Sequence, residues 1–269
     1  MTRDWTAMRA VLAKDITAVR RSKAVVLPML IVPFLLLVVL PLAIGVAALS
    51  SQPPGVGGFL EAVPGTLADK IRGLPEREQL LMLVDGYLLA PLFMIVPLMV
   101  ASVLAADAFA GEKERKTLEG LLHLPIGERD LFYAKVGGAF FPAMAVSWIG
   151  FLLFVIIANS IGWGVMHRLF LPTRLWMVMM AWVAPAVAAL GMGVMVRVSA
   201  RARTTQEANQ LGGAVVLPLI FLVVGQSTGL LLVELPIVIA AGAVAWSIAL
   251  WLLHRGAARF TRDAMLEAG

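Results

Sequence analysis

Long apolar runs with almost no charge constrain the fold of this chain more than any other feature of its sequence. The first run extends from Ala24 through Gln52 without a charged residue. A helix of about 20 apolar residues crosses the hydrocarbon core of a bilayer, whereas barrel strands alternate polar and apolar residues over about 10 positions. Only 14% of all residues are charged, too few to cover a soluble protein. The sequence therefore predicts an all-α integral membrane protein.

Six membrane spans are expected, separated by segments that carry charges or contain Gly and Pro. Their approximate ranges are 24–49, 86–106, 136–158, 175–196, 207–224 and 235–253. Together they would form one transmembrane domain over residues 24–254, followed by a short cytoplasmic tail at residues 255–269. A polar segment at 225–229 interrupts the apolar sequence before the sixth span. It fits either a re-entrant hairpin, in which Gln226 and Ser227 would face a transport pathway, or an ordinary outer loop.

The distribution of Lys and Arg indicates the orientation of the spans. If both termini lie in the cytoplasm, the expected cytoplasmic segments hold 17 of the 22 Lys and Arg residues, and the outer segments hold 5. Cytoplasmic loops of membrane proteins carry an excess of these residues. We therefore expect a multi-pass protein of a bacterial or archaeal cell (inner) membrane, with both termini cytoplasmic. The same topology explains the net charge of +5, so no nucleic-acid partner is expected.

Residues 1–23 are expected to form an amphipathic helix that lies on the inner leaflet. Apolar residues recur every three or four positions and so share one face of a helix: Trp5, Met8, Leu12, Ile16 and Val19. Basic residues occupy the rest of the surface and would contact anionic lipid: Arg3, Arg9, Lys14, Arg20 and Arg21. Anchoring to membrane lipid is enough to explain this pattern. Packing against a partner that guides the first span is the alternative.

Few residues within the spans carry catalytic or binding chemistry. Asp85 begins the second expected span, where it would line a pathway, lie at the outer interface or cap the helix that starts there. The three His residues lie on different segments, so no metal site is expected. The chain also lacks Cys and a G-x-x-x-x-G-K-[ST] phosphate loop. We expect no enzymatic activity and no cofactor bound by the chain itself.

The segment between the second and third spans, residues 107–135, carries 11 charges in 29 residues. Within it, Leu118, Leu121 and Leu122 share one helical face, and Pro125 would end that helix. A short cytoplasmic helix with an apolar edge and charged flanks is a surface that a soluble partner could bind. A solvated loop that only determines topology would have the same composition, so the residues alone leave both interpretations open.

The run AADAFAGEKERKTLEGLLHLPIGERDLFYAKV, however, resembles a segment characteristic of ABC-2 type permeases. The matching positions are Glu112, Glu114, Thr117, Leu121, Leu122, Pro125 and Lys135. The second inner loop, VSARARTTQEANQLGGAVVLP, resembles the loop that precedes the fifth span in the same family. Its matching positions are Ser199, Thr204, Glu207, Ala208 and Gln210.

This resemblance implies a permease subunit of an ATP-driven ABC exporter that works as a dimer, with a homodimer expected. A separate ABC ATPase subunit would bind ATP and Mg²⁺ and drive the permease through short coupling helices. The residues expected at this contact are Glu112, Glu114, Thr117, Leu118, Leu121, Leu122, Pro125, Arg203, Thr204 and Glu207. The apolar spans suit a hydrophobic or amphipathic substrate such as a lipid, drug or peptide. A non-transporting assembly subunit of a membrane complex and a secondary transporter are the alternatives.

Overall fold

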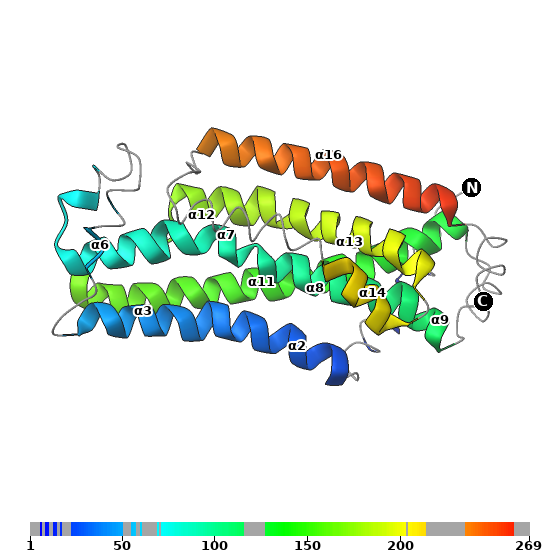
Figure 1. Ribbon diagram of the computed structural model, residues 1–269, viewed down its shortest axis with the longest axis horizontal. Coiled ribbons are helices and arrows are strands. Elements are labelled where there is room, and N and C mark those ends of the chain that lie inside the picture. The colour runs from blue at the N-terminus through cyan, green and yellow to red at the C-terminus, as the bar shows by residue number, and fades with distance from the viewer. Residues whose placement is uncertain are drawn as a thin grey trace.

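The structure is a computed structural model. It describes residues 6, 9–10, 13–14, 17, 23–50, 55–57, 60, 69, 71–115, 127–202, 204–213 and 235–260. Within these ranges the chain is almost entirely helical and contains no strand. The long helices run side by side along the longest axis of the molecule and form a bundle (Figure 1).

Five helical stretches within the described residues are long and apolar enough to cross a membrane. They are Met29–Leu49, Glu76–Glu114, Glu128–Met166, Arg174–Arg201 and Leu235–Arg259. The expected spans 24–49, 86–106, 136–158, 175–196 and 235–253 all lie within helices. Of the expected span 207–224, only the beginning is described, in the short helix α14 (Thr205–Gly212). A sixth span therefore stays a prediction, while the described residues support an all-α, multi-pass membrane protein.

Several of these stretches combine α-helical and π-helical segments. The first consists of α2 (Lys23–Phe34), η1 (Leu35–Val39) and α3 (Leu40–Leu49). The second consists of α6 (Glu76–Leu83), η2 (Val84–Leu88), α7 (Leu89–Phe93), α8 (Ile95–Ala106), η3 (Asp107–Gly111) and α9 (Glu112–Glu114). The others are α11 (Glu128–Met166), then α12 (Arg174–Val178) with η4 (Met179–Val183) and α13 (Ala184–Arg201), and finally α16 (Leu235–Arg259).

The second and third stretches are longer than the expected spans. Each has 39 residues, which corresponds to about 58 Å against a hydrocarbon core of about 30 Å. The second helical stretch begins at Glu76, about 10 residues before the expected span. Its first residues, Glu76 and Arg77, are polar, but both are good helix formers, so the helix extends beyond the apolar run. At the other end, the first part of the expected charged loop continues the same helix as far as Glu114. The helix ends therefore project beyond the bilayer.

Helix α13 lies between α8 and α16, and glycines allow the close approach of these helices. A Cβ atom on Gly191 would lie 2.7 Å from the Ser102 hydroxyl and 3.2 Å from the Leu98 carbonyl oxygen of α8. A Cβ atom on Gly193 would lie 2.8 Å from the Cβ of Leu252 on α16. Small residues at such contacts are typical of helix pairs packed in membranes. Helix α13 is thus fixed on two sides, and its last turn is held at one end of the bundle.

The other helices expose large apolar side chains on their outer faces. Leu27 on α2, Ile156 on α11 and Leu250 on α16 are 61%, 61% and 58% exposed. Helices have no unpaired backbone groups along their length, so such faces can contact lipid chains directly. Exposed apolar faces of this kind are typical of helices that cross a bilayer.

Candidate functional site

Charged side chains from several helices meet at one end of the bundle, where α9, the start of α11, the end of α13 and the start of α14 lie close together (Figure 1). We call this group the charged junction. It consists of Lys14, Asp107, Glu112, Lys113, Glu114, Arg115, Lys135, Thr204, Thr205 and Glu207. The sequence-predicted residues Glu112, Glu114, Thr204 and Glu207 are among them. Residues far apart in the chain are therefore brought into one polar cluster.

The π-helical turn η3 and Gly111 explain how the junction is formed locally. The turn leads from the apolar helix α8 into the charged helix α9 without a break. A Cβ atom on Gly111 would lie 2.9 Å from Asp107 Oδ1 and 3.0 Å from Arg115 Nη2. Any larger residue at this position would therefore displace the Asp107–Arg115 pair. Wide π-type turns within α-helices often occur at functional sites.

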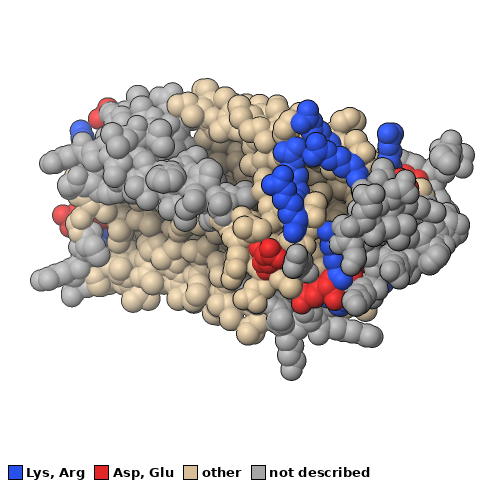
Figure 2. Space-filling model, turned by 45° about the vertical axis from the view of Figure 1, so that its right-hand side comes forward, with Lys and Arg blue, Asp and Glu red and all other residues tan. Residues whose placement is uncertain are grey.

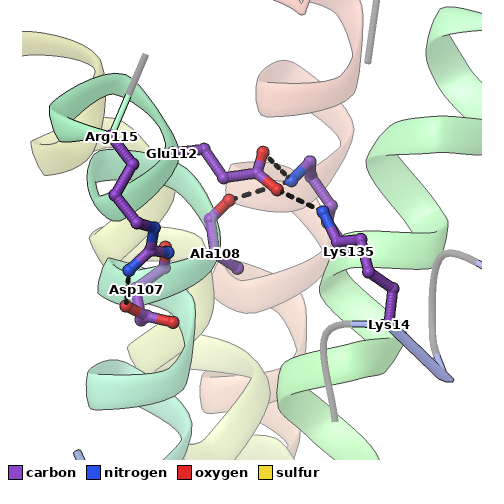
Figure 3. Close-up of polar contacts among 6 residues, drawn as sticks. All are labelled: Lys14, Asp107, Ala108, Glu112, Arg115 and Lys135. Atoms are coloured by element: carbon purple, nitrogen blue, oxygen red, sulfur yellow. Dashed lines mark hydrogen bonds and ion pairs between the residues drawn. The ribbon is translucent and has the colours of Figure 1, made fainter. Parts of the chain in front are cut away.

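A buried ion pair between Glu112 and Lys135 lies at the centre of the junction (Figure 3). The Lys135 side chain is fully buried, and its ammonium group also donates a hydrogen bond to the Ala108 carbonyl oxygen at 3.0 Å. The second carboxylate oxygen of Glu112 accepts a hydrogen bond from Lys14 Nζ at 2.8 Å. The Phe109 ring lies 5.8 Å from Lys135 Nζ. Buried charges need partners of this kind, so the cluster ties α9 to α11 and to the N-terminal segment.

Arg115 and Asp107 form a second pair on the next face of the same helix. Their Nη1 and Oδ1 atoms are 3.0 Å apart, and the Asp107 carboxyl is mostly buried while Arg115 is about half exposed. This hydrogen bond raises the pKa of the Arg115 guanidinium above its ordinary value, so the group keeps its charge. The pair spans the π-helical turn and holds its shape.

Lys113 connects α9 to the end of α13. Its ammonium group donates hydrogen bonds to the carbonyl oxygens of Ser199 and Ala200, at 3.3 and 3.0 Å. The last carbonyls of a helix have no partner within the helix and carry partial negative charge, which favours a cation at this place. The end of α13 is therefore bonded to the end of the second helix.

Glu114 connects α9 to the start of α14. Its Oε2 atom accepts hydrogen bonds from both the backbone N–H and the hydroxyl of Thr205, each at 2.9 Å. Thr204 caps the same helix by accepting a hydrogen bond from the Glu207 backbone N–H at 3.1 Å. The Thr-x-x-Glu spacing is that of a capping box. Three successive residues, Glu112 to Glu114, thus contact three different helices.

Sequence reasoning identified part of this junction and missed the rest. Thr117, Leu118, Leu121, Leu122, Pro125 and Arg203 lie outside the described residues, so their expected role at the ATPase contact stays a prediction. The missed members are Lys14, Asp107, Lys113, Arg115 and Thr205; Lys135 was matched to the family pattern only. One signal for Lys135 was available: a cation among apolar residues at the start of a span needs a buried partner.

The expected membrane anchor is described at only a few residues, among them Lys14, which pairs with Glu112 at the charged junction. Trp5, Leu12, Arg20 and Arg21 lie outside the described residues, and Arg9 is described and exposed. Gln226 and Ser227 of the expected pathway also lie outside the described residues. The interfacial helix and the polar segment therefore stay predictions.

Asp85 lies far from the junction, toward the opposite end of the second helix. It sits in η2, is fully buried, and neither carboxyl oxygen has a hydrogen-bond partner among the described residues. Only its backbone carbonyl is engaged, accepting a hydrogen bond from Trp176 Nε1 at 2.8 Å. The helix begins at Glu76, so the interpretation of Asp85 as a helix cap is wrong. The start of this helix was predicted too late because residues 76–79, which precede the apolar run, are polar but form helix well.

Comparison with known protein families shows which family this chain resembles. The model of a family described as ABC-2 family transporter protein matches residues 9–247, which include most of the described helices and the whole charged junction. No curated protein and no solved structure matches the chain.

Proposed function

The chain belongs to the ABC-2 family of transporter proteins, and from this premise we propose that it is the membrane-spanning subunit of an ATP-driven ABC exporter. Family membership makes it a multi-pass ABC transporter permease that is not itself catalytic and that works with a partner ATPase. The finer proposal is that the ATPase is a separate polypeptide that binds ATP and Mg²⁺. Membership of an ABC transporter family also argues against the alternative that the chain is a secondary transporter.

The charged junction is the observation that best supports coupling to an ATPase. Lys113 joins the end of the second helix to α13, and Glu114 joins it to α14, through direct hydrogen bonds. Glu112 adds the buried bond to α11. A force on α9 would therefore move the ends of several spans together, as rigid-body transitions between two packings require. A solvated loop that served only topology would need none of these bonds.

The remaining residues of the expected coupling segment directly follow this junction in the chain. In the proposal, Thr117, Leu118, Leu121, Leu122 and Pro125 contact the ATPase, and the junction passes the movement to the spans. Arg203 and Glu207 lie in the second inner loop and complete the contact. The ATPase would thus meet the permease at both inner loops.

The proposed orientation places the charged junction and both termini in the cytoplasm of a bacterial or archaeal cell. Lys14, Lys113, Lys135, Arg197 and Arg255 lie on the segments that meet at the junction end, which the positive-inside rule assigns to the cytoplasm. One copy would supply half of an exporter, so two copies would pair, and the apolar outer faces offer the surface for this contact. The proposed substrate is hydrophobic or amphipathic, in keeping with the scarcity of charge within the spans.

Co-purification with an ABC ATPase tests the proposal. The chain would be tagged, co-expressed with a candidate ATPase encoded beside it, and purified through the tag. A complex of two permease and two ATPase subunits with ATPase activity is expected. Leu121→Asp and Leu122→Asp should abolish the stimulation of ATPase activity by the permease. The matched control is Leu169→Asp, because Leu169 is 71% exposed in the connection between α11 and α12 at the opposite end.

The outcomes separate the proposal from its alternatives. A stoichiometric complex that loses stimulated activity in the two inner-loop variants but not in Leu169→Asp would support coupling at this end. A chain that purifies alone would overturn the proposal and favour a non-transporting assembly subunit. Full stimulation in both inner-loop variants would overturn the proposed contact at Leu121 and Leu122.

A further inference from the structure

A cavity of about 740 Å³ opens beside the charged junction, between the last turns of α13 and the end of α16. Four cationic side chains line it, Lys113, Arg197, Arg201 and Arg259, and no acidic residue is among its lining residues. Figure 2 shows Lys and Arg gathered at this end of the molecule, beside a broad surface that is uncharged in this view. The cavity therefore favours an anionic ligand.

The walls of the cavity are apolar. Phe109, Leu211, Leu252 and Phe260 line it together with the valines of α13. Leu211 is 55% exposed although it borders the cavity. A small soluble anion would leave this apolar surface in contact with water, whereas a ligand with a hydrocarbon chain would cover it. Phosphate joined to an acyl chain is the chemistry that fits both parts.

Trp251 indicates the depth of the cavity in the bilayer. Its ring is 49% exposed, and the guanidinium groups of Arg197 and Arg255 lie 5.0 and 4.6 Å from the ring centre. Trp residues gather at the membrane–water interface, where the ring lies at the level of the lipid headgroups. Arg197 connects this interfacial ring to the cavity, so the basic residues lie where lipid phosphates would be.

The four cationic side chains differ in the contacts that they make within the protein. Lys113 donates hydrogen bonds to the carbonyl oxygens of Ser199 and Ala200, and the Arg197 guanidinium lies over the Trp251 ring. Arg201 and Arg259 are exposed and have no acidic partner among the described residues. These two guanidinium groups can therefore turn their donors toward a ligand phosphate, a geometry that arginine suits well.

We propose that this cavity binds an anionic phospholipid from the leaflet at this end of the bundle. The headgroup phosphate lies between Arg201 and Arg259, and an acyl chain lies along Leu211 and Leu252. Basic pockets between membrane helices on the cytoplasmic side bind anionic lipids in this way. The inference does not depend on coupling to an ATPase, because it rests on the cavity, its lining residues and the neighbouring Trp251.

Lipid binding to the full-length chain tests this inference. The chain would be purified in a nonionic detergent, freed of co-purified lipid, and titrated by native mass spectrometry with phosphatidylglycerol and with phosphatidylcholine of the same acyl chains. Phosphatidylglycerol should bind more tightly. Arg201→Gln/Arg259→Gln should weaken its binding by about tenfold or more, since each basic contact with anionic lipid contributes about 1 kcal/mol.

Two control variants keep the test specific. Arg168→Gln/Arg174→Gln removes the same charge at the opposite end of the bundle and should leave phosphatidylglycerol binding unchanged. Arg201→Lys/Arg259→Lys keeps both charges in the cavity and should retain most of the binding. The melting temperature of each variant shows whether it is folded.

Several results would overturn the inference. Equal binding of the two lipids, or an equal loss in Arg168→Gln/Arg174→Gln, would mean that no specific site exists. Binding of glycerol 3-phosphate as tight as that of the lipid would assign the cavity to a soluble phosphate. If Arg201→Gln/Arg259→Gln kept its lipid binding but lost a co-purifying ATPase, the cavity would be a protein-docking surface instead.

Discussion

Two buried acidic residues on the same long helix have opposite environments. Glu112 lies at the charged junction, where its carboxylate bonds to Lys135 and Lys14. Asp85 lies near the other end, equally buried, and its carboxyl oxygens have no hydrogen-bond partner among the described residues. Each is in or beside a π-helical turn. The comparison shows that a membrane helix can bury an acid either as one half of a charge pair or without compensation.

The difference between the two residues decides what each can do. An ionised carboxylate held between two lysines fixes the positions of the segments that carry them, because separating the pair leaves buried charges. An uncompensated carboxyl in the same kind of environment is stable only in its neutral form. We therefore expect Glu112 to transmit force between helices, and Asp85 to contribute no link between them.

Removal of the Lys135 ammonium should have the largest effect on stability. Lys135→Met leaves Glu112 buried beside Lys14, which is about half exposed, and loss of one partner of a buried pair typically costs about 3–5 kcal/mol. The free energy of unfolding in detergent micelles, measured with denaturant, would show this loss. The double variant Glu112→Gln/Lys135→Met removes both charges of the buried pair and should recover part of the loss, because Lys14, which loses its bond to Glu112, is about half exposed. A Lys135→Met variant as stable as the native chain would remove the basis of the comparison.

An intermediate effect is expected for the pair on the next helix face. Arg115→Gln removes the guanidinium from Asp107, whose side chain is 11% exposed. Because Arg115 itself is half exposed, water replaces part of the interaction, and a loss of about 1–2 kcal/mol is expected. The same unfolding measurement checks the value. A loss as large as that of Lys135→Met would show that exposure does not set the strength of the pairs at this end.

Asp85→Asn should change the stability by less than about 1 kcal/mol, because an amide has the shape and neutrality of a protonated carboxyl. Glu112→Gln is the matched substitution at the other end of the comparison, and it should destabilise clearly because it leaves Lys135 buried without a full counter-charge. Unfolding of the two variants under identical conditions gives the contrast. A strong destabilisation by Asp85→Asn would mean that Asp85 is ionised and has a partner in another subunit.

Much of the fold was predictable from the sequence because apolar runs and charged ends determine which segments enter a bilayer. The runs around residues 24–49, 136–158 and 235–253 all lie in helices. The true helix ends were not predictable in the same way. Residues 76–79 are polar, yet they are good helix formers, and nothing in their charge shows that the helix has already begun. This is why Asp85 was mistaken for a possible cap.

The candidate site was predictable only where local patterns reveal it. Thr204 and Glu207 have capping-box spacing, and Glu112 and Glu114 match the family segment. The partners of these residues come from elsewhere: Lys135 is 23 positions from Glu112, and Lys14 is 98 positions away. Such pairs depend on how the helices pack, and no local spacing encodes them. The cavity between α13 and α16 was missed for the same reason.

The smallest effect on stability and the most informative effect on function are expected at Glu114. Its bonds to Thr205 lie at the exposed surface, where water competes for both groups, so Glu114→Gln should leave the free energy of unfolding unchanged within error. If movement of α9 is passed to α14, however, the same variant should lower the ATPase activity stimulated by the permease several-fold.

The control for Glu114→Gln is Glu76→Gln, the same change at an exposed position at the opposite end of the same helical stretch. It should alter neither the free energy of unfolding nor the stimulated ATPase activity. Lower stimulated ATPase activity at unchanged stability would show that the Glu114–Thr205 bonds transmit movement without stabilising the fold. The buried Glu112–Lys135 pair cannot make this distinction, because its loss would affect both stability and coupling. Unchanged ATPase activity in Glu114→Gln would instead confine transmission to the buried pair.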